Sequence, residues 1–249
     1  VLIKDNSYDR AKARRVLHER GKDILPDLKQ WLFRHAENET AQLEALWLHE
    51  AVNVVNASLL MLTLGANDAR VRAAAMRVLA HWHDRLTTTQ LHAAAGIRDK
   101  HPRVRLEAMR VYAQMKDSTV AHQYAQYALQ ALDQPMDKFL DYGLWLTMND
   151  LAEPFVHGMK NGALNFKDKT TNAEFALRAL PSGRAASLIG QLVKQRKLPP
   201  DGSGPLIELV GAAGGPNELG LLYKQLLKDG FEAKVVPRVL AALARAAYF

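Results

Sequence analysis

The chain has 249 residues, of which 48% are hydrophobic and 24% charged, a composition typical of a folded rather than a disordered protein. Lys and Arg number 33 against 26 Asp and Glu, so the net charge is +7, and no run of basic residues concentrates it into the footprint of a nucleic-acid binder. The lack of cysteine excludes disulfides, thiolate metal sites and c-type haem attachment within these residues, and no apolar run is long enough to span a bilayer.

Helical periodicity begins near the N-terminus. A first helix is expected from Ser7, a good N-cap residue, to Arg20, and a second over residues 24–35. Thr40 is expected to cap a third helix, and Asn56 a short apolar helix that ends at Gly65. The N-terminal part of the chain is therefore predicted to consist of short helices joined by short turns.

The centre of the chain carries an internal repeat. Residues 67–82 read NDARVRAAAMRVLAHW and residues 100–115 read KHPRVRLEAMRVYAQM, and Arg70 matches Arg103, an offset of 103 − 70 = 33 residues. That length fits a hairpin of two helices, which completes its core by stacking on neighbouring hairpins. A fainter copy at residues 13–17 (ARRVL) places Arg15 where Arg77 stands, and residues 42–47 (QLEALW) resemble 105–110 (RLEAMR).

After residue 133 the repeat register loosens, although helical patterns continue. Outside the two central copies, helices are expected before residue 133 over 87–97 and 117–132, and after it over 137–147, 172–180, 219–227 and 235–247. Residues 198–205 (LPPDGSGP) interrupt the pattern, and a second Gly-rich turn covers residues 211–216. We therefore divide the chain into a repeat array over 1–198 and terminal helical hairpins over 199–249, which either cap the same array or form a separate unit.

Turn residues followed by R-V-R are similar to a HEAT repeat of the short bacterial kind. Asp68 and Pro102 stand in the turn before each copy, and the resemblance covers residues 7–132. It implies an all-α fold, an α-α superhelix (solenoid) of stacked HEAT-like helical hairpins.

Three phrases resemble one particular setting of such repeats: residues 13–21 (ARRVLHERG), 43–52 (LEALWLHEAV) and 137–155 (DKFLDYGLWLTMNDLAEPF). They are similar to the HEAT-repeat segment of large planctomycete- and Bacteroidetes-type membrane-bound dehydrogenase proteins. In that family the segment follows a sugar-dehydrogenase-like β-propeller and precedes a c-type cytochrome domain. The resemblance implies a periplasmic or secreted protein whose catalysis and cofactors belong to other domains, with Val1–Phe249 as an excised helical segment.

Five polar or aromatic residues lie off the apolar stripes of the repeat helices: Trp47, Arg77, His81, Arg110 and Gln114. The second helix of each hairpin is expected to line the concave face, so these are the candidate contact residues. Trp47 occupies the position of Arg77 and Arg110 and is the candidate anchor. We expect that changing Arg77 and Arg110 together weakens partner binding and leaves folding intact.

The paired arginines of the R-V-R motifs, Arg70/Arg72 and Arg103/Arg105, permit two interpretations. They form either a basic stripe that holds phosphates or acidic segments, or a structural ladder. In the ladder one arginine of each pair bridges an acidic residue of its own or the adjacent repeat, and the other is solvated. We favour the ladder, because repeated helices produce it without any ligand.

No residue pattern indicates chemistry. His49-Glu50 begins a zinc-protease helix motif, but position 53 is Asn53 where a second histidine is needed, and His81 and His83 are two residues apart on a helix and diverge. We therefore predict no catalytic, cofactor or metal site.

The sequence thus predicts a non-catalytic scaffold or interaction module that binds a protein partner or neighbouring domains of the same chain. The alternative is a nucleic-acid-binding HEAT-like protein such as a DNA glycosylase, which grips the backbone with a basic concave face. A bilin lyase is a third and only generic resemblance. A uniformly positive inner face would favour the glycosylase, and mixed charge would favour the scaffold.

Overall fold

The computed structural model describes residues 2–3, 6–164, 166, 170–180, 184–196, 198–204 and 206–246. In these ranges the secondary structure is helical throughout, with fifteen α-helices, two short 3-10 helices and no strand. The prediction of an all-α protein is confirmed. The chain divides into two compact units, Val1–Met115 and Lys116–Phe249.

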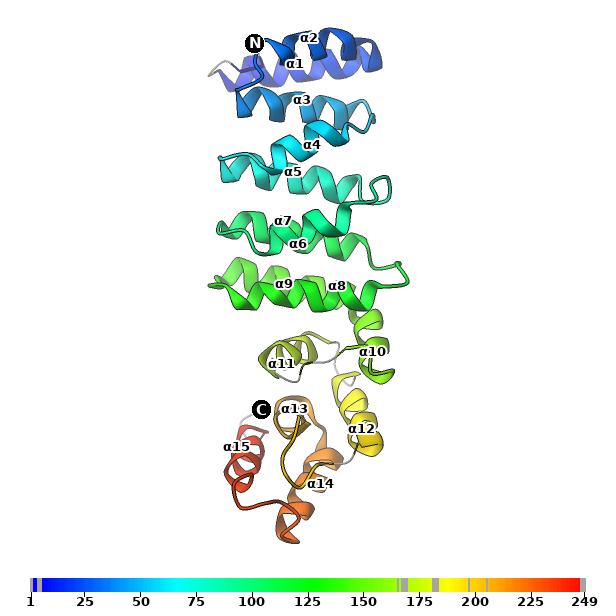
Figure 1. The fold of residues 1–249 in the computed structure, drawn as a ribbon, viewed down its shortest axis with the longest axis vertical. Coiled ribbons are helices and arrows are strands. Elements are labelled where there is room, and N and C mark those ends of the chain that lie inside the picture. Colours follow the sequence, from blue (N-terminus) through cyan, green and yellow to red (C-terminus); the bar gives the residue numbers. More distant parts are fainter. Residues whose placement is uncertain are drawn as a thin grey trace. The chain divides into compact units, whose positions relative to one another are not determined.

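Unit 1 alternates long and short helices. The long ones have 13 residues each and are α1 (Ser7–Glu19), α3 (Glu39–Ala51), α5 (Ala69–His81) and α7 (Pro102–Gln114). The short ones are α2 (Leu25–Phe33), α4 (Ala57–Leu64) and α6 (Thr89–Ile97). Each long helix packs against the next long helix and, from α3 onward, against the short helix that precedes it. Helices that follow one another in the sequence of unit 1 are therefore also neighbours in space (Figure 1).

Asparagine side chains set the starts of three of these helices. Asn56 accepts the N–H of Leu59 at the start of α4, as the sequence predicts. Two other predicted caps are off by one or two residues: Asn6 rather than Ser7 caps α1, and Asn38 rather than Thr40 caps α3. The amide oxygen of Asn accepts as well as a hydroxyl does, and Asn6 and Asn38 each stand at the residue where the backbone is still extended.

Trp82 and small residues form the centre of unit 1. Trp82 follows α5 directly and has no exposed surface. Alanines allow the long helices to approach closely, and at Gly96 even a methyl group would meet Ala108 Cβ at 2.8 Å. The largest fully buried side chains around Trp82 in this unit are Leu46, Leu48, Leu60, Leu79, Ile97, Met109 and Tyr112.

The second arginine of each R-V-R motif ties its helix to the preceding loop. Arg72 Nη1 donates to the carbonyl oxygens of Ala66 and Asn67 at 2.9 and 2.8 Å. Arg105 Nη1 donates in the same way, to the carbonyl of Asp99 at 2.9 Å and to that of the following residue at 3.1 Å. Arg72 also holds the Asp99 carboxylate of the next loop with two hydrogen bonds of 2.7 and 2.9 Å. The ladder interpretation is confirmed for Arg72, which bridges an acidic residue of the adjacent repeat, whereas these contacts of Arg105 are made to backbone carbonyls.

The Asp99 contact makes unit 1 acid-sensitive. Burial raises the pKa of Asp99, but hydrogen bonds from Arg72 and from the backbone N–H of His101 more than offset this and leave the pKa below its ordinary value. Asp99 therefore binds a proton more readily in the unfolded chain than in the folded one, so acid favours unfolding. The stabilisation from this contact is lost as the pH falls from about 5 through the lowered pKa of Asp99 in the folded chain.

We expect Asp99→Asn to flatten this dependence. The midpoint of thermal unfolding, followed by circular dichroism from pH 6 to pH 3, should fall less steeply for Asp99→Asn than for the wild type. Asp84→Asn is the control, because the Asp84 side chain is 69% exposed. Equal slopes for all three proteins would contradict the role given to Asp99.

Unit 2 contains eight α-helices within its described ranges: α8 (Ala121–Ala128), α9 (Lys138–Asp150), α10 (Ala152–Lys160), α11 (Thr170–Ala179), α12 (Arg184–Arg196), α13 (Leu206–Ala213), α14 (Pro216–Leu227) and α15 (Val236–Ala246). The helix predicted over 117–132 is wrong in extent, because α8 ends at Ala128 and a 3-10 helix, Leu129–Asp133, follows. The sequence patterns did not predict α10, α12 or α13. Residues 211–213, predicted as a turn, are the end of α13.

Close helix contacts hold the C-terminal part of unit 2 together. A methyl group on Gly211 of α13 would lie 2.7 Å from the backbone of Ala242 in α15, so this pair packs backbone to backbone. Helix α12 packs against both α13 and α14. The predicted division at 198/199 stays a prediction. Among the described helices of both units, none has the length and apolar character needed to cross a membrane.

Candidate functional site

Two positions of the long helices, the ninth and the thirteenth residue, carry the predicted contact residues. The ninth residue is Trp47 in α3, Arg77 in α5 and Arg110 in α7, and the thirteenth is His81 in α5 and Gln114 in α7. Nine and thirteen are one turn apart, so these side chains lie on the same face of each helix. Because α5 packs directly against α7, their copies of this face adjoin.

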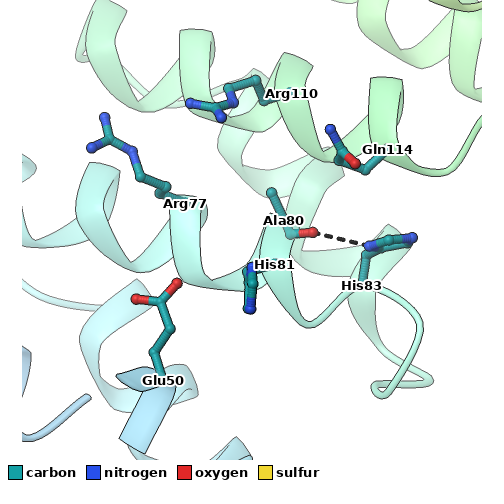
Figure 2. Close-up of a pocket in the computed structure, with 7 residues that line it drawn as sticks. All are labelled: Glu50, Arg77, Ala80, His81, His83, Arg110 and Gln114. Atoms are coloured by element: carbon teal, nitrogen blue, oxygen red, sulfur yellow. Dashed lines mark hydrogen bonds between the residues drawn. The ribbon is translucent and has the colours of Figure 1, made fainter. Parts of the chain in front are cut away.

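A hollow of about 360 Å³ lies at this junction (Figure 2). Four of the five predicted contact residues line it: Arg77, His81, Arg110 and Gln114. The remaining lining residues are Glu50 of α3, Ala80 of α5 and His83 of the loop that follows α5. The structure thus brings together residues from three consecutive long helices.

Two of the lining arginines, Arg77 and Arg110, contact a buried carboxylate, that of Glu107. The Glu107 side chain is 5% exposed and accepts two hydrogen bonds from Arg77, one through Nη2 and one through Nε at 3.4 Å. The second guanidinium, that of Arg110, lies 3.7 Å from the other Glu107 oxygen. The hydrogen bond to Glu107 raises the pKa of Arg77.

Arg77 is therefore a structural residue as well as a surface one. Its guanidinium is the hydrogen-bonding partner of a carboxylate that water barely reaches, and removing it would leave Glu107 buried without that partner. The expectation that changing Arg77 and Arg110 together leaves folding intact stays a prediction, and this contact indicates that the change would lower stability. Arg110, whose side chain is 60% exposed, is the cleaner position for substitution.

Glu50 supplies a second acidic group at the α3 side of the hollow. Burial raises the pKa of its carboxyl, and the positive charges of His81 and Arg77 oppose that rise. In the described part of the chain no hydrogen bond to the Glu50 carboxylate is found, so its oxygens are available as acceptors. Figure 2 shows the carboxylate turned toward Arg77, on the side of the hollow away from Gln114.

His81 and His83 border the hollow without forming a metal site. His83 Nδ1 lies 3.0 Å from the carbonyl oxygen of Ala80, and His81 is exposed (Figure 2). Within the described ranges no group of three or more His, Asp or Glu side chains is placed to hold a metal ion. The hollow is lined by two guanidinium groups, two imidazoles, one amide, one carboxylate and the Ala80 methyl group.

Trp47 lies apart from the other four predicted residues. It is half-buried and borders a separate hollow with Arg14, Arg15 and His18 of α1. The Arg14 guanidinium lies 4.8 Å from the Trp47 ring centre, a cation–π contact, and also binds Glu44. The ring is therefore partly covered by its own repeat neighbour.

Glu44 and Glu107 are the site-building residues that sequence reasoning did not single out. Arg14 binds Glu44 and Arg77 binds Glu107, and both pairs are separated by 30 residues. The signal was present in the repeat, because QLEALW and RLEAMR share this glutamate. The Arg14–Glu44 pair also corrects the alignment of the first copy, because Arg14, and not Arg15, makes the contact that Arg77 makes in α5.

The first arginines of the R-V-R motifs do not join the hollow. Arg70, with 87% of its side chain exposed, pairs with Asp68 at 2.7 Å, and Arg103 is exposed.

No protein-family model matches the chain, and no curated protein is similar enough in sequence to count as a relative. The chemistry of the site is therefore read from its own residues.

The hollow presents more hydrogen-bond donors than acceptors. Two guanidinium groups, an amide and two imidazoles can donate hydrogen bonds, and the Glu50 carboxylate can accept them. Such a set can recognise a polar group with both acidic and N–H character.

Proposed function

We propose that this chain is a non-catalytic helical-repeat interaction module, and that the exposed face of α5 and α7 binds a protein partner or a neighbouring domain of the same chain. The observation that carries the proposal is the hollow formed by Arg77, Arg110, Gln114 and Glu50 from three consecutive repeats. Arginine is enriched at protein interfaces, and its long side chain offers both donors and contact area.

The charge pattern of this face favours a protein over a nucleic acid. Arg77 and Arg110 share the Glu107 carboxylate, and Glu50 adds a second negative charge beside them. Nucleic-acid binders present many unpaired cations to successive phosphates, whereas the two arginines of this face are paired with one carboxylate. Mixed charge on this face is the pattern expected for an interaction scaffold, whereas a DNA glycosylase would present a uniformly positive face.

The packing order of unit 1 supports the further proposal that its hairpins are HEAT-like and stack as a solenoid. Each long helix contacts the next, and Arg72 and Arg105 repeat the same loop contacts. We propose, from the resemblance to dehydrogenase-associated repeats, that such a segment positions larger domains. In that setting the redox chemistry belongs to the domains on either side.

A peptide-display selection against the full chain tests the proposal. Selected peptides are expected to protect backbone amides of α5 and α7 from hydrogen exchange, and to bind Arg110→Gln at least about ten-fold more weakly than the wild type. Arg103→Gln is the matched control, since it removes the same charge from an exposed position of the same helix. Protection confined to other helices, or equal binding by both variants, would overturn the assignment.

A titration with duplex and single-stranded DNA tests the rival. We expect no binding near physiological salt, because the face carries about as much negative as positive charge. Tight binding that weakens steeply as salt rises would instead support the nucleic-acid alternative.

A further inference from the structure

We propose that the hollow between α5 and α7 is a carboxylate-binding subsite, which takes one acidic group of an extended peptide between Arg77 and Arg110. The inference rests on the proposed function and names the chemical group that the interaction face recognises. The carboxylate comes from an acidic side chain or from a chain terminus, and both present the same two oxygens.

The first step is the supply of donors. A guanidinium has five N–H groups, and Arg77 uses two of its nitrogen atoms on Glu107, while the nearest nitrogen of Arg110 lies 3.7 Å from a Glu107 oxygen. At 3.7 Å the Arg110 contact is an ion pair and not a hydrogen bond, so N–H groups of both arginines remain for a ligand. Gln114 adds an amide from the neighbouring turn of α7 (Figure 2).

The second step is preorganisation. Glu107 is fixed in the core and holds the Arg77 guanidinium from below, so that side chain loses little additional freedom when a ligand binds. Charge-assisted bonds from arginine to carboxylate are short and strong, and a planar guanidinium matches the two oxygens of a carboxylate. Arginine held by a buried acid is a prepared receptor for a second, external carboxylate.

The third step limits the charge of the ligand. Arg77 and Arg110 contribute two positive charges, and Glu107 and Glu50 contribute two negative ones. A single carboxylate leaves the hollow with a charge of −1, which hydrogen bonds from the remaining donors can offset. A dianionic phosphate would add a further negative charge beside Glu50 and is therefore disfavoured.

The fourth step identifies a peptide as the carrier of the carboxylate. Glu50 offers acceptor oxygens at the α3 side of the hollow, and a peptide backbone supplies N–H groups near its acidic side chain. The volume of about 360 Å³ is at the lower end of the range for binding pockets and accommodates one side chain with its backbone. Donors for the carboxylate and an acceptor for the backbone thus lie in one hollow.

Nuclear magnetic resonance of the full chain tests this with three small probes. These are a tripeptide with glycines around a central glutamate and both ends blocked, its glutamine counterpart, and triglycine with a blocked amine and a free terminal carboxylate. The side-chain signals of Gln114 and of the arginine Nε–H groups are expected to shift saturably with at least one carboxylate probe and not with the glutamine probe. The better carboxylate probe identifies the source of the group.

Matched variants locate the effect. Arg110→Gln is expected to weaken binding at least about ten-fold, and Arg103→Gln less than about two-fold. Glu50→Gln should strengthen it, because a negative charge beside the ligand is removed. Equal binding of the glutamine probe, tighter binding of inorganic phosphate, or equal effects of Arg110→Gln and Arg103→Gln would overturn the carboxylate assignment.

The outcome is distinguishable from failure of the proposed function. If display-selected peptides still map to α5 and α7 but no carboxylate probe shifts Gln114, the interaction face stands and the carboxylate subsite fails. If selected peptides map to other helices while the probes shift Gln114, the subsite stands as a small-ligand site and the interaction module fails.

Discussion

Arg77→Ala is expected to lower the free energy of unfolding by about 1–3 kcal/mol, although Arg77 is a surface residue. The loss comes from Glu107, whose side chain is 5% exposed and whose two hydrogen bonds from Arg77 would disappear. Since 52% of the Arg77 side chain is exposed, water replaces part of the interaction, and the cost stays below the loss of about 3–5 kcal/mol that breaking a fully buried pair causes. Urea unfolding followed by circular dichroism measures it.

A double-mutant cycle separates the pair from its surroundings. Glu107→Gln in the Arg77→Ala background removes the unpaired buried charge, so the double variant should be more stable than the sum of the two single changes predicts. Arg103→Ala is the control for losing an exposed arginine. Additive losses would show that Arg77 and Glu107 are not coupled, and the description of their contact would be wrong.

Trp82→Ala is expected to cost about 3–5 kcal/mol, a larger loss than that of Arg77→Ala. The indole has no exposed surface, and it directly follows the last residue of α5, so its removal would leave a cavity in the core. The Arg85 guanidinium, 5.8 Å from the ring centre, closes the solvent side. The same urea experiment reports the change.

An exposed aromatic residue provides the comparison for Trp82. Phe33→Ala removes a side chain that is 85% exposed and should alter stability by no more than about 0.5 kcal/mol. A loss below about 1 kcal/mol for Trp82→Ala would mean that the alanine-rich helices collapse into the cavity, contrary to the close packing seen at Gly96.

The two central repeats were predicted closely because local rules decide them. The stretch 67–82 contains α5 (Ala69–His81), and 100–115 contains α7 (Pro102–Gln114). Asp68 and His101 cap these helices with their own side chains, and apolar spacing fixes the buried face. In unit 2 the same rules were weaker. The predicted 117–132 helix turns into a 3-10 helix at Leu129, which is held from outside by Asn172 donating to its carbonyl.

The hollow was half predictable. Position on the helix indicated that Arg77, His81, Arg110 and Gln114 share a face, and the packing of α5 on α7 brings them together. The partners of the arginines could not be read in this way. The Arg77–Glu107 contact joins two repeats, so it depends on how the helices pack and not on local sequence. Glu50 reaches the hollow from a third helix, α3, for the same reason. Trp47 was separated from the group by Arg14, a contact across 33 residues of sequence.

The loop bonds of Arg72 and Arg105 bear on how such a chain can grow. Each arginine grips the carbonyls of the loop before its own helix, and Arg72 also grips the Asp99 carboxylate in the loop after it. A tandem duplication of residues 69–101 would therefore bring both halves of every clamp with it, since the new arginine would find the old loop and the new loop would meet the old arginine of α7. In evolutionary terms the loop contacts recur with every 33-residue copy, whereas the Arg77–Glu107 pair does not, because α5 has Ala74 at the position of Glu107.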